Sequence, residues 1–544
     1  MAAGFSLATR LFAQTSQTSG AGALSIAGGA FQPSWESLTN FHCPEWFRDA
    51  KFGIWAHWSA QCVPEQGDWY ARSMYVQGSA DYKYHVEHYG HPSKVGFKDI
   101  DHDWHAENWN PEMLIALYKR AGAKYFMALG NHHDNFDCWN SKYQPWNSVK
   151  IGPHRDIVGE WAKAARQAGL RFGVSVHASH AWNWFEVAAG ADTNGLLAGV
   201  PYDGKLTQAD GRGLWWDGLD PQDLYAQNHA PGRDFVWDFD PAKGSSTPDT
   251  AYCLKFFNRI KDLVDSYHPD LVYFDDSVLP LEKVDPAYGL SIAAHLYNAS
   301  IRWHGRNESV MTCKDLNPMQ RQALVYDIER GKAADILPFP WQTDTCIGSW
   351  HYQRSLLDKH QYKTAGTVIH MLVDIVSKNG NLMLSIPVRG EGTIDYDEIT
   401  CLEGIARWMS VNRECIFGTR PWMIYGEGPS VGNEEKGHFG GVKDTGGKAY
   451  TAQDIRFTTK GKALYAIALG WPQDGQLVVR SLSKIPGDGS ANKIRKIILL
   501  GHSGKLTWSQ TTNGLRIKLP AHKTSDFTCA IRINGRNLKP APWQ

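Results

Sequence analysis

Short apolar segments alternate with helical patterns over about 360 residues, and this alternation restricts the fold more than any other feature of the chain. Each apolar segment has the length of a buried strand and ends on polar residues. We predict strands at 51–57, 123–129, 171–176, 271–275, 309–313, 323–326 and 381–386. Apolar residues at helical spacing predict helices over 111–121, 156–168 and 250–267. Strands that alternate with helices indicate a parallel sheet with crossover helices.

This number of strands favours an α/β fold of the closed (β/α)8-like barrel type over an open doubly wound sheet. No glycine-rich nucleotide-binding motif supports the open alternative. After about residue 420 the helical spacing disappears, and short alternating runs separated by Gly and Pro predict a β-sandwich. We therefore expect an N-terminal segment at 1–33, a catalytic barrel at 34–420 and an all-β domain at 421–544.

Charge and cysteine content exclude several classes of function. Lys+Arg and Asp+Glu both number 56, a balance that argues against a nucleic-acid partner or a polybasic membrane surface. No apolar run is long enough for a transmembrane helix. The nine cysteines form no CxxC pair, so a zinc site or a dense disulfide framework is not expected, while a single disulfide stays open.

The N-terminus, residues 1–29, is mildly apolar and rich in Ser, Thr, Gly and Ala. It has the composition of a secretory signal that lacks its basic start, or of a disordered extension. On the first interpretation we expect a periplasmic or extracellular protein.

Polar residues follow the predicted strands, where a barrel would bring them to one mouth. Asp275 ends a strand and is a candidate catalytic carboxylate, although a capping role is the alternative. His57, His132, His133 and His177 end or follow other strands. Adjacent side chains in an extended segment diverge, so we do not expect a metal site or any cofactor here.

Imidazole, indole and carboxyl groups around one mouth suit a sugar, because they can exchange hydrogen bonds with hydroxyls and cover the apolar face of the ring. A pair of carboxylates would add the equipment of a retaining glycosidase.

Several blocks of the chain resemble one enzyme family, the α-L-fucosidases of glycoside hydrolase family 29. The blocks occur in the family's order over residues 34–425. They are WFRDAKFGIWAHW at 46–58, GDWY at 67–70, AGAKY at 121–125, HHDNF at 132–136, WQTDT at 341–345, GSW at 348–350 and KNGNLML at 378–384.

The resemblance implies a retaining mechanism with Asp275 as the nucleophile. It also implies that His57, His132 and His133 contact the hydroxyls of fucose. By the same match the indoles of two residues line the pocket near the methyl group and apolar face of the sugar, namely Trp69 and Trp350. Relatives tend to have a tyrosine near His177, which we expect to take over that role.

The general acid/base is harder to place, because many relatives have Glu where this chain has Gln342, and an amide cannot transfer a proton. Glu329 is our candidate for this role. Asp327, Asp344 and Glu65 are its rivals.

We therefore expect a retaining exo-α-L-fucosidase that acts on a fucosylated oligosaccharide or polysaccharide. The alternatives are a retaining α-L-galactosidase, a non-catalytic fucose-binding relative and a metal-dependent hydrolase. A long Gly-, Asp- and Trp-rich insertion at 188–249, which contains Trp215–Trp216–Asp217, is expected to shape the sites beyond the fucose.

Overall fold

A computed structural model describes residues 24–433, 435–437, 441–443, 449–484 and 492–538. Eight parallel strands close into a barrel in the order β1-β2-β3-β4-β5-β6-β8-β9, because β1 pairs with both β2 and β9. The strands are β1 Phe52–Ala56, β2 Tyr125–Asn131, β3 Arg171–Val176, β4 Leu271–Ser277, β5 Val310–Lys314, β6 Val325–Asp327, β8 Trp341–Cys346 and β9 Gly380–Ser385. The predicted barrel is confirmed.

Sequence patterns located seven of these strands within two or three residues at each end, but they missed β8. Its sequence Trp-Gln-Thr-Asp-Thr-Cys lacks the apolar run of the other strands, although all six residues are buried.

The helices outside the barrel begin and end at residues that favour helix termini. Helix α6 (Pro111–Ala121) begins after Asn110, whose side chain accepts from the Met113 N–H, and ends at Gly122 in a left-handed conformation. The other long helices are α7 Ile157–Gln167, α10 Thr250–Tyr267, α11 Pro286–His304, α13 Ala365–Ser377 and α14 Tyr396–Asn412. The shorter ones are α1 Trp35–Leu38, α2 Glu45–Ala50, α3 Tyr70–Ser73, α4 Ala80–His88, α5 Phe97–Asp103, α8 Ala181–Trp184, α9 Gln222–Tyr225 and α12 Arg354–Asp358.

Part of the expected N-terminal extension packs against the barrel. The backbone N–H of Ala27 donates to Nδ1 of His295 (2.9 Å), and that of Phe31 donates to Oδ1 of Asn298 (2.9 Å). Both partners belong to α11, so residues 24–33 cover this helix. The rest of the predicted signal or extension, residues 1–23, lies outside the described residues.

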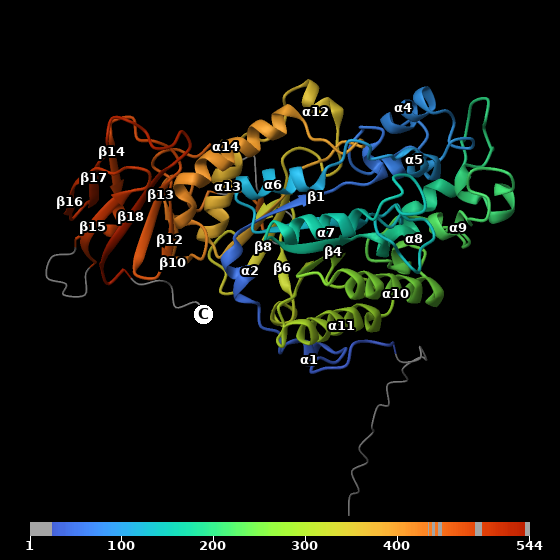
Figure 1. Cartoon of the computed structure of the whole chain (residues 1–544), viewed down its shortest axis with the longest axis horizontal. Helices are drawn as coiled ribbons and strands as arrows, with labels where there is room; N and C mark the ends of the chain where they lie inside the picture. The colour runs from blue at the N-terminus through green and yellow to red at the C-terminus, as the bar shows by residue number, and fades with distance from the viewer. Residues whose placement is uncertain (1–23, 434, 438–440, 444–448, 485–491, 539–544) are drawn as a thin grey trace, which may run out of the picture.

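The insertion at 188–249 contains α9 and several single turns, and no strand is found in it. It lies with α8 and α9 at the end of the molecule opposite the C-terminal sheets (Figure 1). The prediction of a long loop excursion therefore describes this segment well.

The C-terminal part is all-β, as predicted. Five antiparallel strands form one sheet in the order β10-β12-β13-β18-β15, and three form a second in the order β14-β17-β16. One apolar cluster draws residues from both sheets. The strands are β10 Arg420–Glu427, β12 Ile455–Lys460, β13 Ala463–Ala468, β14 Gln476–Val479, β15 Lys493–Leu499, β16 Thr507–Thr511, β17 Gly514–Lys518 and β18 Cys529–Arg536.

All nine cysteines lie in the described ranges and are free thiols. Within those ranges, no helix combines the length and the apolar character that crossing a membrane requires.

A buried carboxylate joins the barrel to the β domain. Asp374 on α13 is fully buried and contacts Arg456 of β12, Lys378 (3.0 Å) and Lys332 (3.2 Å). Although burial opposes its ionisation, these three cations hold the pKa of Asp374 well below its usual range. The carboxylate therefore ties together segments that are far apart in the sequence.

We predict that Asp374→Asn destabilises the protein by about 3–5 kcal/mol, because the buried cations lose a charged partner while the shape is conserved. Thermal and chemical unfolding of the variant measure this loss. Glu403→Gln, which breaks an ion pair of exposed side chains with Arg120, is the control and leaves the unfolding midpoint unchanged. Equal midpoints for both variants would contradict the structural role of Asp374.

Candidate active site

A pocket of about 370 Å³ opens at the carboxyl ends of the barrel strands. Seven of the eight residues predicted from the sequence line it: His57, Trp69, His132, His177, Asp275, Glu329 and Trp350. The eighth, His133, is buried and faces Asp275 with its Nε2 3.3 Å from Oδ2. These eight residues lie at or after the ends of six different strands and thus meet at one place, as a parallel barrel requires.

Asp275 stands two residues before the end of β4 and receives hydrogen bonds from two sides. The Nδ1–H of His177 donates to Oδ2 (3.2 Å), and the Lys314 ammonium donates to Oδ1. Burial opposes ionisation, but Lys314 and the imidazoles of His133 and His177 hold the pKa of Asp275 well below its usual range. The carboxyl group is therefore an anion at neutral pH.

Lys314, the last residue of β5, also reaches Glu329, with Nζ 2.5 Å from Oε2. One ammonium therefore links the two predicted catalytic carboxyl groups. Burial raises the pKa of Glu329, Lys314 opposes that shift, and the nearby carboxyls of Asp344 and Asp275 add to it. Glu329 thus holds a proton more readily than Asp275 does.

Neighbouring side chains fix the orientation of the pocket imidazoles. The Gln61 amide donates to Nδ1 of His132 (2.8 Å), which leaves the His132 proton on Nε2. Nδ1 of His57 lies 3.2 Å from the Ser385 hydroxyl. Burial, followed by neighbouring imidazoles, lowers the pKa of both rings well below 6.5. Both rings are therefore neutral and can exchange hydrogen bonds with hydroxyl groups.

Three of the imidazoles lie close enough to raise the question of a metal ion. His132, His133 and His177 bring one nitrogen each within 4.8 Å of one another. One nitrogen of each is already engaged: His132 with Gln61, His133 with the His177 carbonyl (2.9 Å), and His177 with Asp275. The Lys314 ammonium in the same pocket would repel a further cation. This arrangement fits a polyhydroxyl ligand better than a metal ion.

Aromatic rings form the walls of the pocket. Trp350 packs against His57 with ring centroids 4.8 Å apart. Trp69 lies parallel to Trp237, with centroids 6.4 Å apart and planes 5° apart. Trp237 in turn stacks on His180 (4.0 Å). The insertion therefore reaches the pocket through Trp237, whereas Trp215 stacks on His102 and is not among the residues that line the pocket.

The rivals of Glu329 occupy different environments. Asp344 lines the pocket floor and accepts a hydrogen bond from the Tyr273 hydroxyl (3.0 Å). Asp327 is fully buried and accepts from the Gln342 amide (2.9 Å), and burial together with Asp344 raises its pKa well above 3.8. Glu65 pairs with Arg389 (3.2 Å) and is not among the residues that line the pocket.

The segment that carries Glu329 is held on both sides. The N–H groups of Ile328 and Arg330 donate to carbonyls of β8 (3.0 and 2.8 Å). Arg330 has a left-handed backbone, which turns the chain into β7 (Gly331–Lys332). Strand β7 pairs with β11 (Val442–Lys443) from the C-terminal part. The carboxyl group of Glu329 therefore stands on a segment clamped between the barrel and the C-terminal part.

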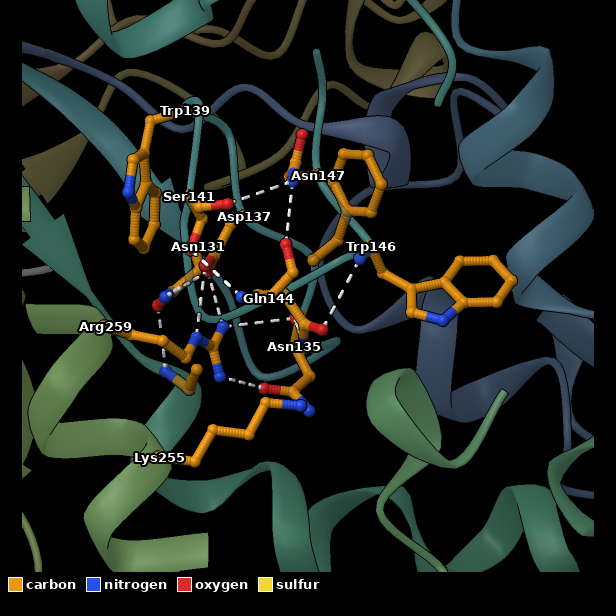
Figure 2. A network of polar contacts seen from close by, with 12 residues as sticks. Asn131, Asn135, Asp137, Trp139, Ser141, Gln144, Trp146, Asn147, Lys255 and Arg259 are labelled. Atoms are coloured by element: carbon orange, nitrogen blue, oxygen red, sulfur yellow. Dashed lines mark hydrogen bonds and ion pairs between the residues drawn. The ribbon is translucent and has the colours of Figure 1, made fainter. Parts of the chain in front are cut away.

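A buried polar network supports the segment that follows β2. Figure 2 shows Arg259 reaching from α10 to Asp137 and to Oδ1 of Asn135 (2.6 Å). Asp137 accepts from Asn131 (3.0 Å), whose side-chain oxygen accepts from the backbone N–H of His177 (3.1 Å). The network connects the His132–His133 turn to β3 and so fixes the spacing of the imidazoles.

Two pocket residues, Lys314 and Trp237, were not predicted from the sequence. Lys314 directly follows the predicted strand 309–313, so its position at a strand end was a usable signal. Trp237 had no such signal, because it lies in an irregular segment whose path depends on the packing of Trp237 and Phe239 against His180.

Comparisons with known proteins identify the family. The α-L-fucosidase family model matches residues 21–414, and the model of the α-L-fucosidase C-terminal domain matches residues 448–533. The tissue α-L-fucosidase of Homo sapiens is 27% identical over 517 residues, covering 93% of this chain and 92% of that enzyme.

Solved structures agree with this assignment. A Thermotoga maritima α-fucosidase in complex with a mechanism-based inhibitor is 25% identical, with a TM-score of 0.67, and covers 93% of this chain and 100% of its own. The same enzyme in complex with fucose gives a TM-score of 0.65 at 25% identity. With matches over both the barrel and the β domain, the chain belongs to the α-L-fucosidase family of glycoside hydrolases.

Proposed function

We propose that the chain is a retaining exo-α-L-fucosidase in which Asp275 is the nucleophile and Glu329 the general acid/base. The observation that carries these assignments is the Lys314 ammonium, which touches both carboxyl groups inside one pocket. Family membership supports the substrate, terminal α-L-fucose on an oligosaccharide or polysaccharide. The reaction needs no cofactor.

The spacing of the carboxyl groups supports retention of configuration. Two oxygens that both contact one Nζ lie no more than roughly 6 Å apart. Retaining glycosidases place their carboxyl groups about 5–5.5 Å apart, whereas inverting enzymes need about 6.5–9.5 Å to admit a water molecule. Asp275 and Glu329 therefore fit direct attack on the sugar.

The charge states of the two groups match the two roles. In the first step Asp275, an anion, attacks C1, while Glu329 gives its proton to the departing glycosidic oxygen. In the second step Glu329 takes a proton from water, the water oxygen bonds to C1, and the bond to Asp275 breaks. Both steps pass through a transition state with positive charge at C1, which the neighbouring carboxylates stabilise.

The shape and lining of the pocket suit one terminal sugar. His57 and His132 are neutral and face it, so they can donate to and accept from hydroxyls. Trp69 and Trp350 offer apolar surface for the methyl group and ring face, and His177 stands beside the nucleophile. We therefore propose that these residues, with His133 behind them, hold the fucose.

Two alternatives predict different measurements. An α-L-galactosidase would accept an extra hydroxyl on C6, which Trp-lined apolar surface disfavours because the hydroxyl would lose its hydrogen bonds to water. A panel of aryl glycosides separates the two specificities. A non-catalytic relative would bind fucose without turnover, a result that the ionised Asp275 argues against.

Export from the cytoplasm stays a prediction that rests on residues 1–29, of which residues 1–23 are outside the described part of the chain. Cell fractionation, with N-terminal sequencing of the mature protein, tests it.

We predict that Asp275→Ala lowers turnover of an aryl α-L-fucoside at least about 1,000-fold, because no nucleophile remains. Added azide should restore turnover and yield fucosyl azide, since the small anion fits the space left by the carboxylate. Asp276→Ala is the matched control, because the Asp276 carboxyl contacts Ser179 and His180 and not the pocket. Added azide should not change the turnover of this variant. Failure of azide to rescue Asp275→Ala would remove Asp275 from its proposed role.

Glu329→Ala should lower the rate of the first step about 100-fold or more for substrates with poor leaving groups. Substrates with good leaving groups should be affected far less, because their leaving groups depart without a proton. Rates for a series of aryl fucosides measure this dependence. The same substitution at Glu65, outside the pocket, should leave the dependence unchanged. If Glu329→Ala affects all leaving groups equally, Asp344 becomes the acid/base candidate.

Gln61→Leu should weaken fucose binding about 5- to 10-fold, because His132 loses the amide that fixes its proton on Nε2. Inhibition by free fucose measures the change. Gln66→Leu removes a similar amide that donates to the Pro64 carbonyl, and we expect unaltered binding. Wild-type affinity in Gln61→Leu would show that the His132 tautomer does not matter for the sugar.

A further inference from the structure

Lys314 occupies a special position among the pocket residues. Among the described residues that line the pocket it is the one lysine or arginine, and its side chain is only 4% exposed. Its Nζ donates to Oδ1 of Asp275 and to Oε2 of Glu329 (2.5 Å). The ammonium is thus shared by the two groups between which the proposed reaction moves negative charge.

Other groups surround this triad. The Tyr273 ring lies 5.6 Å from Nζ, and its hydroxyl donates to Asp344, whose carboxyl adds a negative field at Lys314. His133 and His177 face the other oxygen of Asp275. Burial opposes the charge on Lys314, but Asp275, Glu329 and Asp344 raise its pKa well above 10.5. The lysine therefore stays a cation throughout the pH range in which the carboxyl groups titrate.

We infer that Lys314 is a positioning residue that balances the negative charge of the site as this charge passes from Asp275 to Glu329 and back. The inference rests on the proposed roles of those two carboxyl groups.

The reaction moves one negative charge across the ammonium. When Asp275 bonds to C1 its carboxylate becomes an ester and loses its charge, while Glu329, having given its proton to the leaving oxygen, becomes an anion. Hydrolysis reverses both changes: water bonds to C1, Glu329 takes the proton, and the electron pair of the broken bond returns to Asp275. Because Nζ already contacts both groups, the ammonium can stabilise the negative charge on either carboxyl group without moving.

The same contacts set the pH range of activity. The acid limb of kcat/KM reports ionisation of Asp275, and the alkaline limb reports loss of the proton from Glu329. Lys314 favours the anion at both positions, so it lowers both pKa values. Removing its charge should raise both and move the whole profile toward higher pH.

The test is the pH profile of kcat/KM for an aryl α-L-fucoside with Lys314→Met and Lys314→Gln. Both limbs should move up by about 1–3 pH units, the effect of one opposite charge at this distance. Lys314→Arg keeps the cation, and its limbs should stay within about half a unit of the wild-type positions. Lys98→Met removes another buried lysine, which pairs with Asp99 (2.6 Å), and should leave both limbs in place.

If Lys314 had a purely structural role, its replacement would lower the height of the pH profile without moving its limbs. That result in either Lys314→Met or Lys314→Gln overturns the inference. If neither neutral variant folds, a shift of more than one unit in Lys314→Arg overturns it as well. Failure of the proposed function is recognised separately, since azide would then not rescue Asp275→Ala. Rescue combined with unshifted limbs rejects only the role of Lys314.

Discussion

Closure of the parallel sheet is the constraint on which the rest of the molecule depends. Pairing of β1 with both β2 and β9 brings distant parts of the chain together, so that His57 and Ser385, which are 328 positions apart, come into contact. Every strand then points its carboxyl end at the same mouth, so short polar segments after unrelated strands converge without any local sequence signal. The pocket is a consequence of this topology, and its chemistry depends on which side chains stand at each strand end.

Burial and neighbouring charges within that mouth give different pKa values to Asp275 and Glu329, the two carboxyl groups that contact the Lys314 ammonium. Asp275 receives hydrogen bonds from imidazoles in addition to Lys314, whereas Glu329 has Lys314 on one side and the carboxyl groups of Asp344 and Asp275 nearby. The surrounding charges therefore favour the ionised form of Asp275 and the protonated form of Glu329. Asp327 accepts a hydrogen bond from Gln342 deeper in the barrel, and burial together with the neighbouring Asp344 raises its pKa.

Much of this arrangement was predictable from the sequence because strand and helix patterns are local. The barrel, three helices and the all-β domain followed from apolar spacing, and seven of the eight site residues proposed from the sequence line the pocket. Strand β8 was not predicted because its polar residues find their hydrogen-bond partners on other strands of the barrel, as Gln342 does with Tyr125 of β2 and Asp327 of β6. Trp237 was not predicted because only tertiary packing, such as its stacking on His180, brings the insertion back to the mouth of the barrel.

The C-terminal domain has a direct physical connection to the acid/base position. Glu329 stands two residues before β7, and β7 pairs with β11 from the segment that leads into the β domain. Lys332 at the end of β7 also contacts Asp374, which is paired with Arg456 of the domain's main sheet. A displacement of the domain would therefore pull on the segment that sets the distance from Glu329 to Lys314. The β-sandwich thus supports the geometry of the pocket although none of its strands lines it.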